Sequence, residues 1–86
     1  MRQSSLVTLA EKYLQCLNDV LSRLRKYEKK YGMPTEEFIK KWKSGKIPEP
    51  EDHDTLVDFM NWEEDYELFQ EITRKLRDII ESQRGA

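Results

Sequence analysis

Apolar residues in the first third of the chain recur at the spacing of a packed helix. Steps of four and three residues alternate without a break, as in a helix that packs along another helix. A second stripe beside the first widens the apolar face and favours a bundle over a two-stranded coil. We predict a helix over residues 5–31, capped by Ser4 or Ser5 and ended by Gly32. The first stripe comprises Leu6, Ala10, Tyr13, Leu17, Val20, Leu24, Tyr27 and Tyr31, and the second comprises Val7, Leu14 and Leu21.

The same alternation returns in the last third of the chain. It predicts a second long helix over residues 54–83, with Asp54 as its N-cap. Two helices of ~27–30 residues, each ~40–45 Å long at 1.5 Å per residue, are expected to lie antiparallel. The stripe of this helix comprises Phe59, Trp62, Tyr66, Phe69, Thr73, Leu76 and Ile80, and it is widened by Ile72 and Ile79.

A short helix is predicted between the two long ones, over residues 35–43. Thr35 is expected to cap it, and Phe38 and Trp42, one turn apart, share a face. Residues 44–53 contain two prolines and no periodic pattern, which indicates a surface connection. The predicted fold is therefore all-α, a long antiparallel helical hairpin with a short bridging helix.

The composition changes this picture in one respect. The chain has 86 residues, of which 37% are hydrophobic and 37% charged, whereas soluble domains carry ~45–50% apolar and ~25% charged residues. A chain so short of core material is expected to form a homodimer that closes into a helical bundle. The residues predicted to form the core or the dimer seam are Leu6, Tyr13, Leu17, Val20, Leu24, Tyr27, Phe59, Tyr66, Phe69 and Leu76.

Charge is distributed in blocks along the chain. Residues 23–46 carry nine basic and three acidic residues, whereas residues 47–71 carry ten acidic and no basic residues. The two blocks are expected to face each other across the fold or a dimer axis, or to attract a charged partner. Direct nucleic-acid binding is not expected, because the chain as a whole has a net charge of −2.

The residues offer little chemistry for catalysis. The chain has one His and one Cys, and it lacks a Gly-rich phosphate loop and a Glu-x-x-His element for a bundle metal site. We predict no cofactor, no metal and no catalytic residue. Cys16 is expected to be a buried thiol in a reducing compartment. Neither a signal peptide nor a membrane span is evident, so a cytoplasmic protein that does not contact a membrane is expected.

A set of short motifs between Tyr27 and Tyr66 resembles a known kind of protein. The motifs are Tyr31-Gly32-Met33, Glu36-Glu37-Phe38, Trp42, Gly45-Lys46-Ile47, His53, Asp58 and Asn61-Trp62-Glu63. Their order resembles that of small helical antitoxin-like proteins from the two-gene toxin–antitoxin pairs of archaea and bacteria. The resemblance implies a cytoplasmic, non-enzymatic protein that neutralises a toxin partner.

The sequence thus favours a protein–protein interaction module, with an antitoxin-like role as the leading hypothesis. Its acidic segment would mask a basic active site, because many toxins act on RNA. One alternative is a small metal-dependent hydrolase or nucleotide-binding bundle that uses the acidic helix. Another is a structural dimer with weak nucleic-acid affinity through the basic block. The residues predicted to contact a protein partner are Asp58, Trp62, Glu63, Glu64 and Glu67.

Overall fold

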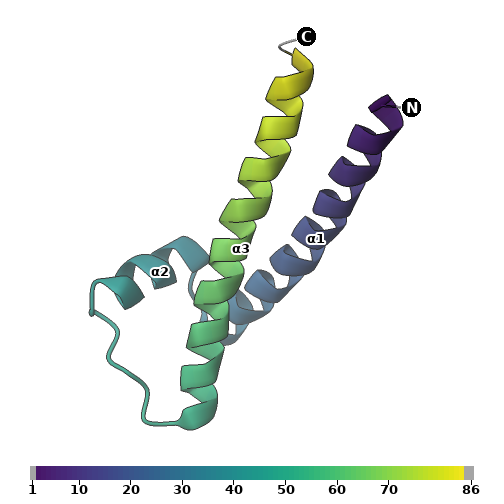
Figure 1. Cartoon of the computed structure of the whole chain (residues 1–86). Helices are drawn as coiled ribbons and strands as arrows, with labels where there is room; N and C mark the ends of the chain where they lie inside the picture. The colour runs from purple at the N-terminus through teal and green to yellow at the C-terminus, as the bar shows by residue number, and fades with distance from the viewer. Residues whose placement is uncertain (1, 85–86) are drawn as a thin grey trace.

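Two long helices and one short helix make up the chain in the computed structural model (Figure 1). The model describes the backbone of residues 2–84 and the side chains of residues 6–84. Helix α1 spans Arg2–Tyr31, α2 spans Thr35–Lys43 and α3 spans His53–Arg84, and no strand occurs within the described residues. Helices α1 and α3 pack antiparallel, so both chain ends lie at the same end of the molecule (Figure 1). The predicted all-α hairpin with a bridging helix is confirmed.

The C-terminal end of α1 matches the prediction, but its N-terminal end does not. The helix begins at Arg2 instead of residue 5, so Ser4 and Ser5 lie inside it and the predicted cap is wrong. The first residues contain neither Gly nor Pro, and nothing in them breaks a helix. Gly32 ends α1 as predicted, with a φ of 65° that side chains disfavour, and Gly45 follows α2 with a φ of 77°.

The start of α3 is capped by a different aspartate from the predicted one. The backbone N–H and the hydroxyl of Thr55 both donate to Asp52 Oδ2, each over 2.9 Å. These two bonds lower the pKa of Asp52. Asp54 lies inside the first turn of α3. The carboxylate three residues before Thr55 caps the helix, because only it has the N-cap spacing to that N–H.

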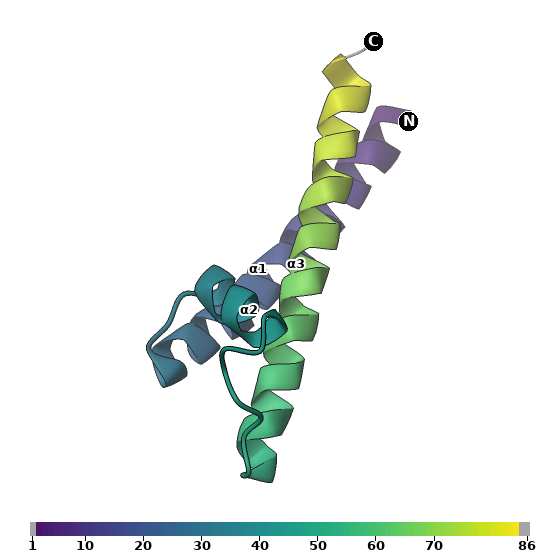
Figure 2. The ribbon, with the colours of Figure 1, turned by 90° about the vertical axis from the view of Figure 1, so that its left-hand side faces the viewer.

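Helix α2 covers one half of the pair formed by α1 and α3. Figure 2, seen from the side that carries α2, shows α2 lying across the lower part of the pair, while both long helices continue beyond it to the chain ends. We call the covered part the three-helix section and the remainder, residues 6–17 with residues 73–84, the two-helix section. The buried hydrophobic residues are Val20, Leu24, Phe38, Ile39, Phe59, Trp62 and Ile72.

Nine of the ten predicted seam residues lie in this core or pack against it. Val20, Leu24 and Phe59 are buried in it. Leu6 is half-buried and lies at the far end of the two-helix section. The seam residues that are half-buried and packed against the core are Tyr13, Leu17, Tyr27, Tyr66, Phe69 and Leu76.

Candidate functional site

The acidic and aromatic segment of α3 is the predicted partner site, and the structure divides it between two sides of the helix. Trp62 is completely buried. Its predicted contact with a partner is therefore wrong, because the ring is enclosed by its own chain. It stacks on Phe38 with 3.9 Å between ring centroids and an interplanar angle of 3°. Tyr27 and Tyr31 stack on it from α1, each at 5.7 Å.

The indole of Trp62 also has a polar partner. Its Nε1–H donates to Thr35 Oγ1 over 2.9 Å, inside the core. Thr35 is only 5% exposed and is the first residue of α2. The prediction that Thr35 caps α2 is wrong, because its hydroxyl accepts the indole proton instead. A buried indole N–H needs such an acceptor.

The cap of α2 comes from another helix. The backbone N–H of Thr35 donates to Glu28 Oε2 of α1 over 2.8 Å. Pro34, in the N-cap position, provides no side-chain hydrogen bond. Glu28 thus satisfies a free N–H of α2 and places a negative charge at the positive end of its dipole. Sequence reasoning missed this residue, although it is the one acid among the basic residues 23–30.

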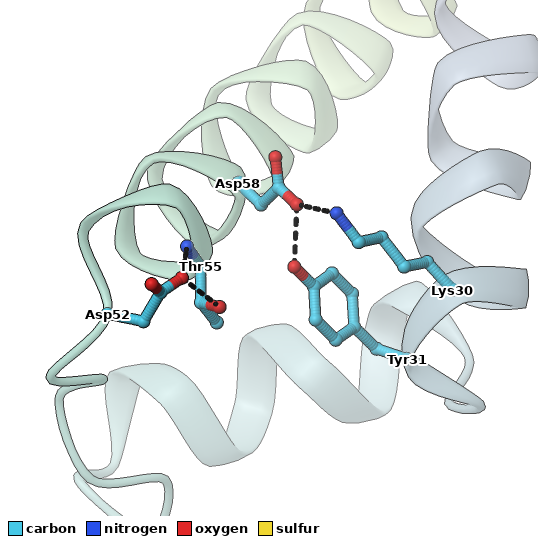
Figure 3. Close-up of polar contacts among 5 residues, drawn as sticks. All are labelled: Lys30, Tyr31, Asp52, Thr55 and Asp58. Carbon is cyan, nitrogen blue, oxygen red and sulfur yellow. Dashed lines mark hydrogen bonds and ion pairs between the residues drawn. The ribbon is translucent and has the colours of Figure 1, made fainter.

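Asp58, the first of the predicted partner residues, is engaged within the hairpin. Its Oδ2 accepts hydrogen bonds from Lys30 Nζ over 2.7 Å and from the Tyr31 hydroxyl over 2.6 Å (Figure 3). The bond from Lys30, followed by that from Tyr31, lowers the pKa of Asp58. Burial and the bond to Asp58 raise the pKa of Tyr31. The fold itself therefore uses this carboxylate.

Two further acids of α3 are also held by the fold. Arg23 Nε of α1 lies 3.1 Å from Asp65 Oδ2 and forms an ion pair with it. The indole Nε1–H of Trp42 donates to Glu63 Oε1 over 3.3 Å. The Arg23–Asp65 and Lys30–Asp58 pairs place part of the basic block against part of the acidic block across the fold, which is one of the predicted arrangements.

The remaining predicted residues lie on the opposite side of α3. Glu64 and Glu67 are exposed, and neither carboxylate forms an ion pair among the described residues. Three large apolar side chains share this side with them: Val57 is 37% exposed, Met60 53% and Leu68 42%. Steps of three or four residues lead from Val57 to Met60, from Met60 to Glu64, and from Glu64 to both Glu67 and Leu68, so the five share one helix face. We call Val57, Met60, Glu64, Glu67 and Leu68 the outer stripe of α3.

Three other features of the molecule give weaker support for a functional site than the outer stripe does. Cys16 is exposed, so the prediction of a buried thiol is wrong; it lies beside the seam and not in it. A shallow hollow on α1 is lined by Arg25, Lys26 and Lys29 of the basic block. Among the residues that the structure describes, no three His, Cys, Asp or Glu side chains gather closely enough to hold a metal ion.

Comparison with known proteins adds no relative. No family model, no curated protein and no solved structure matches this chain. Within the described part of the chain, no helix is long and apolar enough to cross a membrane.

Proposed function

We propose that this chain is a non-enzymatic protein–protein interaction module that binds a basic partner protein through the outer stripe of α3. The observation that carries the proposal is the mixture of side chains on that stripe. Val57, Met60 and Leu68 are exposed apolar residues, and they flank Glu64 and Glu67, whose carboxylates form no ion pair with the described side chains. An apolar contact surface with charges around it is the usual composition of a protein-binding site.

The other side of α3 supports this use of the stripe. Trp62 is buried, and Asp58 and Asp65 form ion pairs with α1. These contacts fix the position of α3 from the side opposite the outer stripe. Binding at the stripe would therefore cost little conformational entropy of the α3 backbone. The fold also neutralises its inner acids and leaves the outer ones to attract a basic surface.

The resemblance to antitoxin-like proteins supports a specific form of this function. In that form, the outer stripe covers the basic active site of a small toxin. The exposed glutamates would then occupy positions that RNA phosphates otherwise take, because both ligands present negatively charged oxygens to Lys and Arg.

The test begins with identifying the partner. The tagged chain is isolated from its native cells, and bound proteins are identified by mass spectrometry. The expected partner is a small basic protein, encoded by the neighbouring reading frame in the antitoxin-like form. The purified pair is then compared with the variant Glu64→Lys/Glu67→Lys, whose association rate should fall by about tenfold or more at low salt. The difference should shrink as salt rises, because screening weakens the steering.

A matched control carries the same change of charge elsewhere. Glu49→Lys/Glu51→Lys alters two exposed acids of the connection before α3. It should leave the association rate within about twofold of the wild type if the stripe is the contact surface. Equal losses from the two double variants would reduce the effect to net charge and contradict the proposal. Met60→Ala should instead accelerate dissociation, because it removes an apolar contact.

A further inference from the structure

The apolar groove between α1 and α3 remains open beyond the start of α2, towards the chain ends. One hollow of about 260 Å³ lies at the start of α2, and its lining includes Leu21, Tyr66, Phe69 and Glu36. A second hollow of about 340 Å³ lies near the chain ends. Its apolar lining consists of Leu6, Val7, Ala10, Ile79 and Ile80.

A row of apolar residues on α1 runs from one hollow to the other. On α1, Val7, Leu14 and Leu21 are seven residues apart and so lie along one side of the helix. Val7 is 52% exposed and Leu14 is 49% exposed. On α3, Ile80 is 57% exposed. Single exposed apolar residues are ordinary, but a strip shared by two helices marks a surface that packs against something.

From this strip we infer that the two-helix section binds a second copy of the chain, groove to groove, about a twofold axis. The inference concerns the groove and not the outer stripe, so it goes beyond the proposed function and does not depend on it. Each two-helix section supplies two antiparallel helices with one apolar side. Two such layers packed face to face form a four-helix bundle, and a twofold axis makes the same strip serve both copies.

Charges at the two ends of the groove favour a second copy of the chain as the binding partner. The end next to α2 carries Arg25, Glu28 and Glu36, a net charge of −1, and the end near the chain termini carries Arg84. A twofold axis perpendicular to the groove reverses the partner copy. It therefore places the Arg84 end of each copy against the Glu36 end of the other, so that opposite charges meet at both ends of the interface.

The area of the groove sets the expected strength of the dimer. From Leu6 to Leu21, α1 extends ~22 Å, and two helices side by side are ~20 Å wide. This gives ~450 Å² for each copy and ~900 Å² for the pair, which is below the ~1,200 Å² of stable interfaces and typical of weak, transient ones. We therefore expect monomer and dimer to exchange, with dissociation in the range of about 1–100 µM.

The first test is the mass of the full chain by sedimentation equilibrium over about 1–500 µM. The wild type should approach twice the mass of one chain as concentration rises. Leu14→Glu should remain at the mass of one chain and keep its helicity, because Leu14 is already half exposed in a single chain. Met60→Glu, a matched control at an equally exposed residue of the outer stripe, should dimerise like the wild type.

Three results would overturn the inference. One is a wild type that stays at the mass of a single chain, which would leave the groove to a helix from another protein. Another is dissociation by Met60→Glu as complete as that by Leu14→Glu. The third concerns the pairing of charges between the two copies. Glu36→Arg and Arg84→Glu should each weaken the dimer by about two- to fivefold, the effect of an exposed ion pair. The combined variant should restore wild-type affinity, and failure to do so would exclude the reversed arrangement.

Discussion

The three-helix section and the two-helix section carry the same pattern of apolar residues, but only one of them is a closed core. In the three-helix section, α2 adds Phe38 and Ile39, and all the buried hydrophobic residues lie between Val20 and Ile72. In the two-helix section, the described side chains are half-buried or exposed. The same helix pattern can therefore end in a core or in an open surface, depending on whether a third element covers it.

The length of α2 explains where the boundary falls. Nine residues at 1.5 Å each extend only ~13 Å, whereas each long helix extends ~45 Å. The Trp62–Thr35 and Thr35–Glu28 hydrogen bonds attach the start of α2 near the middle of the hairpin. From that point α2 runs across the hairpin and not along it towards the chain ends, so the groove beyond its start is left uncovered (Figures 1 and 2).

The sharpest test of this contrast is to shorten one aromatic or apolar side chain in each section. Trp62→Ala should lower the free energy of unfolding by ~3–5 kcal/mol, because it empties the centre of the aromatic stack. Leu76→Ala, in the two-helix section, should cost only ~1–2 kcal/mol, because its side chain is half-buried. Urea unfolding followed by circular dichroism gives both values, at concentrations low enough to avoid association. Equal losses would contradict the division into two sections.

A second prediction concerns the polar group that fixes α2 in the core. Thr35→Val keeps the shape of the side chain but removes the acceptor of the Trp62 indole proton. A buried donor left without a partner costs ~1–3 kcal/mol. Thr35→Ser, which keeps the hydroxyl, should cost clearly less. If Thr35→Val proves harmless and Thr35→Ser costs stability, packing of the methyl group and not the hydrogen bond holds this position.

The contacts of Thr35 and Trp62 also show which features of the fold the sequence could predict and which it could not. The spacing of apolar residues was sufficient for the three helices, for the hairpin and for the seam, because helix periodicity depends only on local order. It placed Trp62 on the apolar stripe but did not decide its role, since a tryptophan in an acidic segment fits a binding site as well as a core. The structure decides through Thr35 and Phe38, which come from a different helix.

The caps illustrate the same limit. Gly32 was recognised because a glycine after a helix has a local conformational reason. Glu28 was not recognised as the cap of α2, since the bond to Thr35 joins residues of two helices around a turn. The exposure of Leu14 likewise depends on what α2 leaves uncovered, which the pattern within α1 does not contain.

A third prediction tests the cap that α1 provides for α2. Glu28→Ala should lower stability by ~0.5–2 kcal/mol, the usual cost of losing a cap. Glu28→Gln retains an acceptor oxygen and should lose only part of this, chiefly the interaction of the charge with the helix dipole. Hydrogen exchange should show faster exchange in α2 for Glu28→Ala, with little change in residues 6–17. Uniform acceleration along α1 would instead place the effect within α1 itself.

The smallest predicted effect concerns the ion pairs that join α1 to α3, and it depends on pH. The folded-state pKa of Asp58 is lowered by Lys30 and Tyr31, so its contribution to stability is present above the ordinary aspartate pKa of about 3.9 and is lost as pH falls through the folded value. The pKa of Tyr31 is raised, so its contribution is present below about 10 and is lost as pH rises further. Stability should therefore be level between these limits.

Replacing this carboxylate should reproduce the acid loss at neutral pH. Asp58→Asn should cost ~0–1 kcal/mol at pH 7, the range for partly exposed ion pairs, and its difference from the wild type should vanish below the folded pKa of Asp58. Tyr31→Phe and Lys30→Met separate the two donors. The tyrosine variant should cost more, because its hydroxyl is partly buried, whereas the Lys30 side chain is 62% exposed and its bond is screened by water. A larger loss from Lys30→Met, abolished by salt, would show that charge dominates over the buried hydrogen bond.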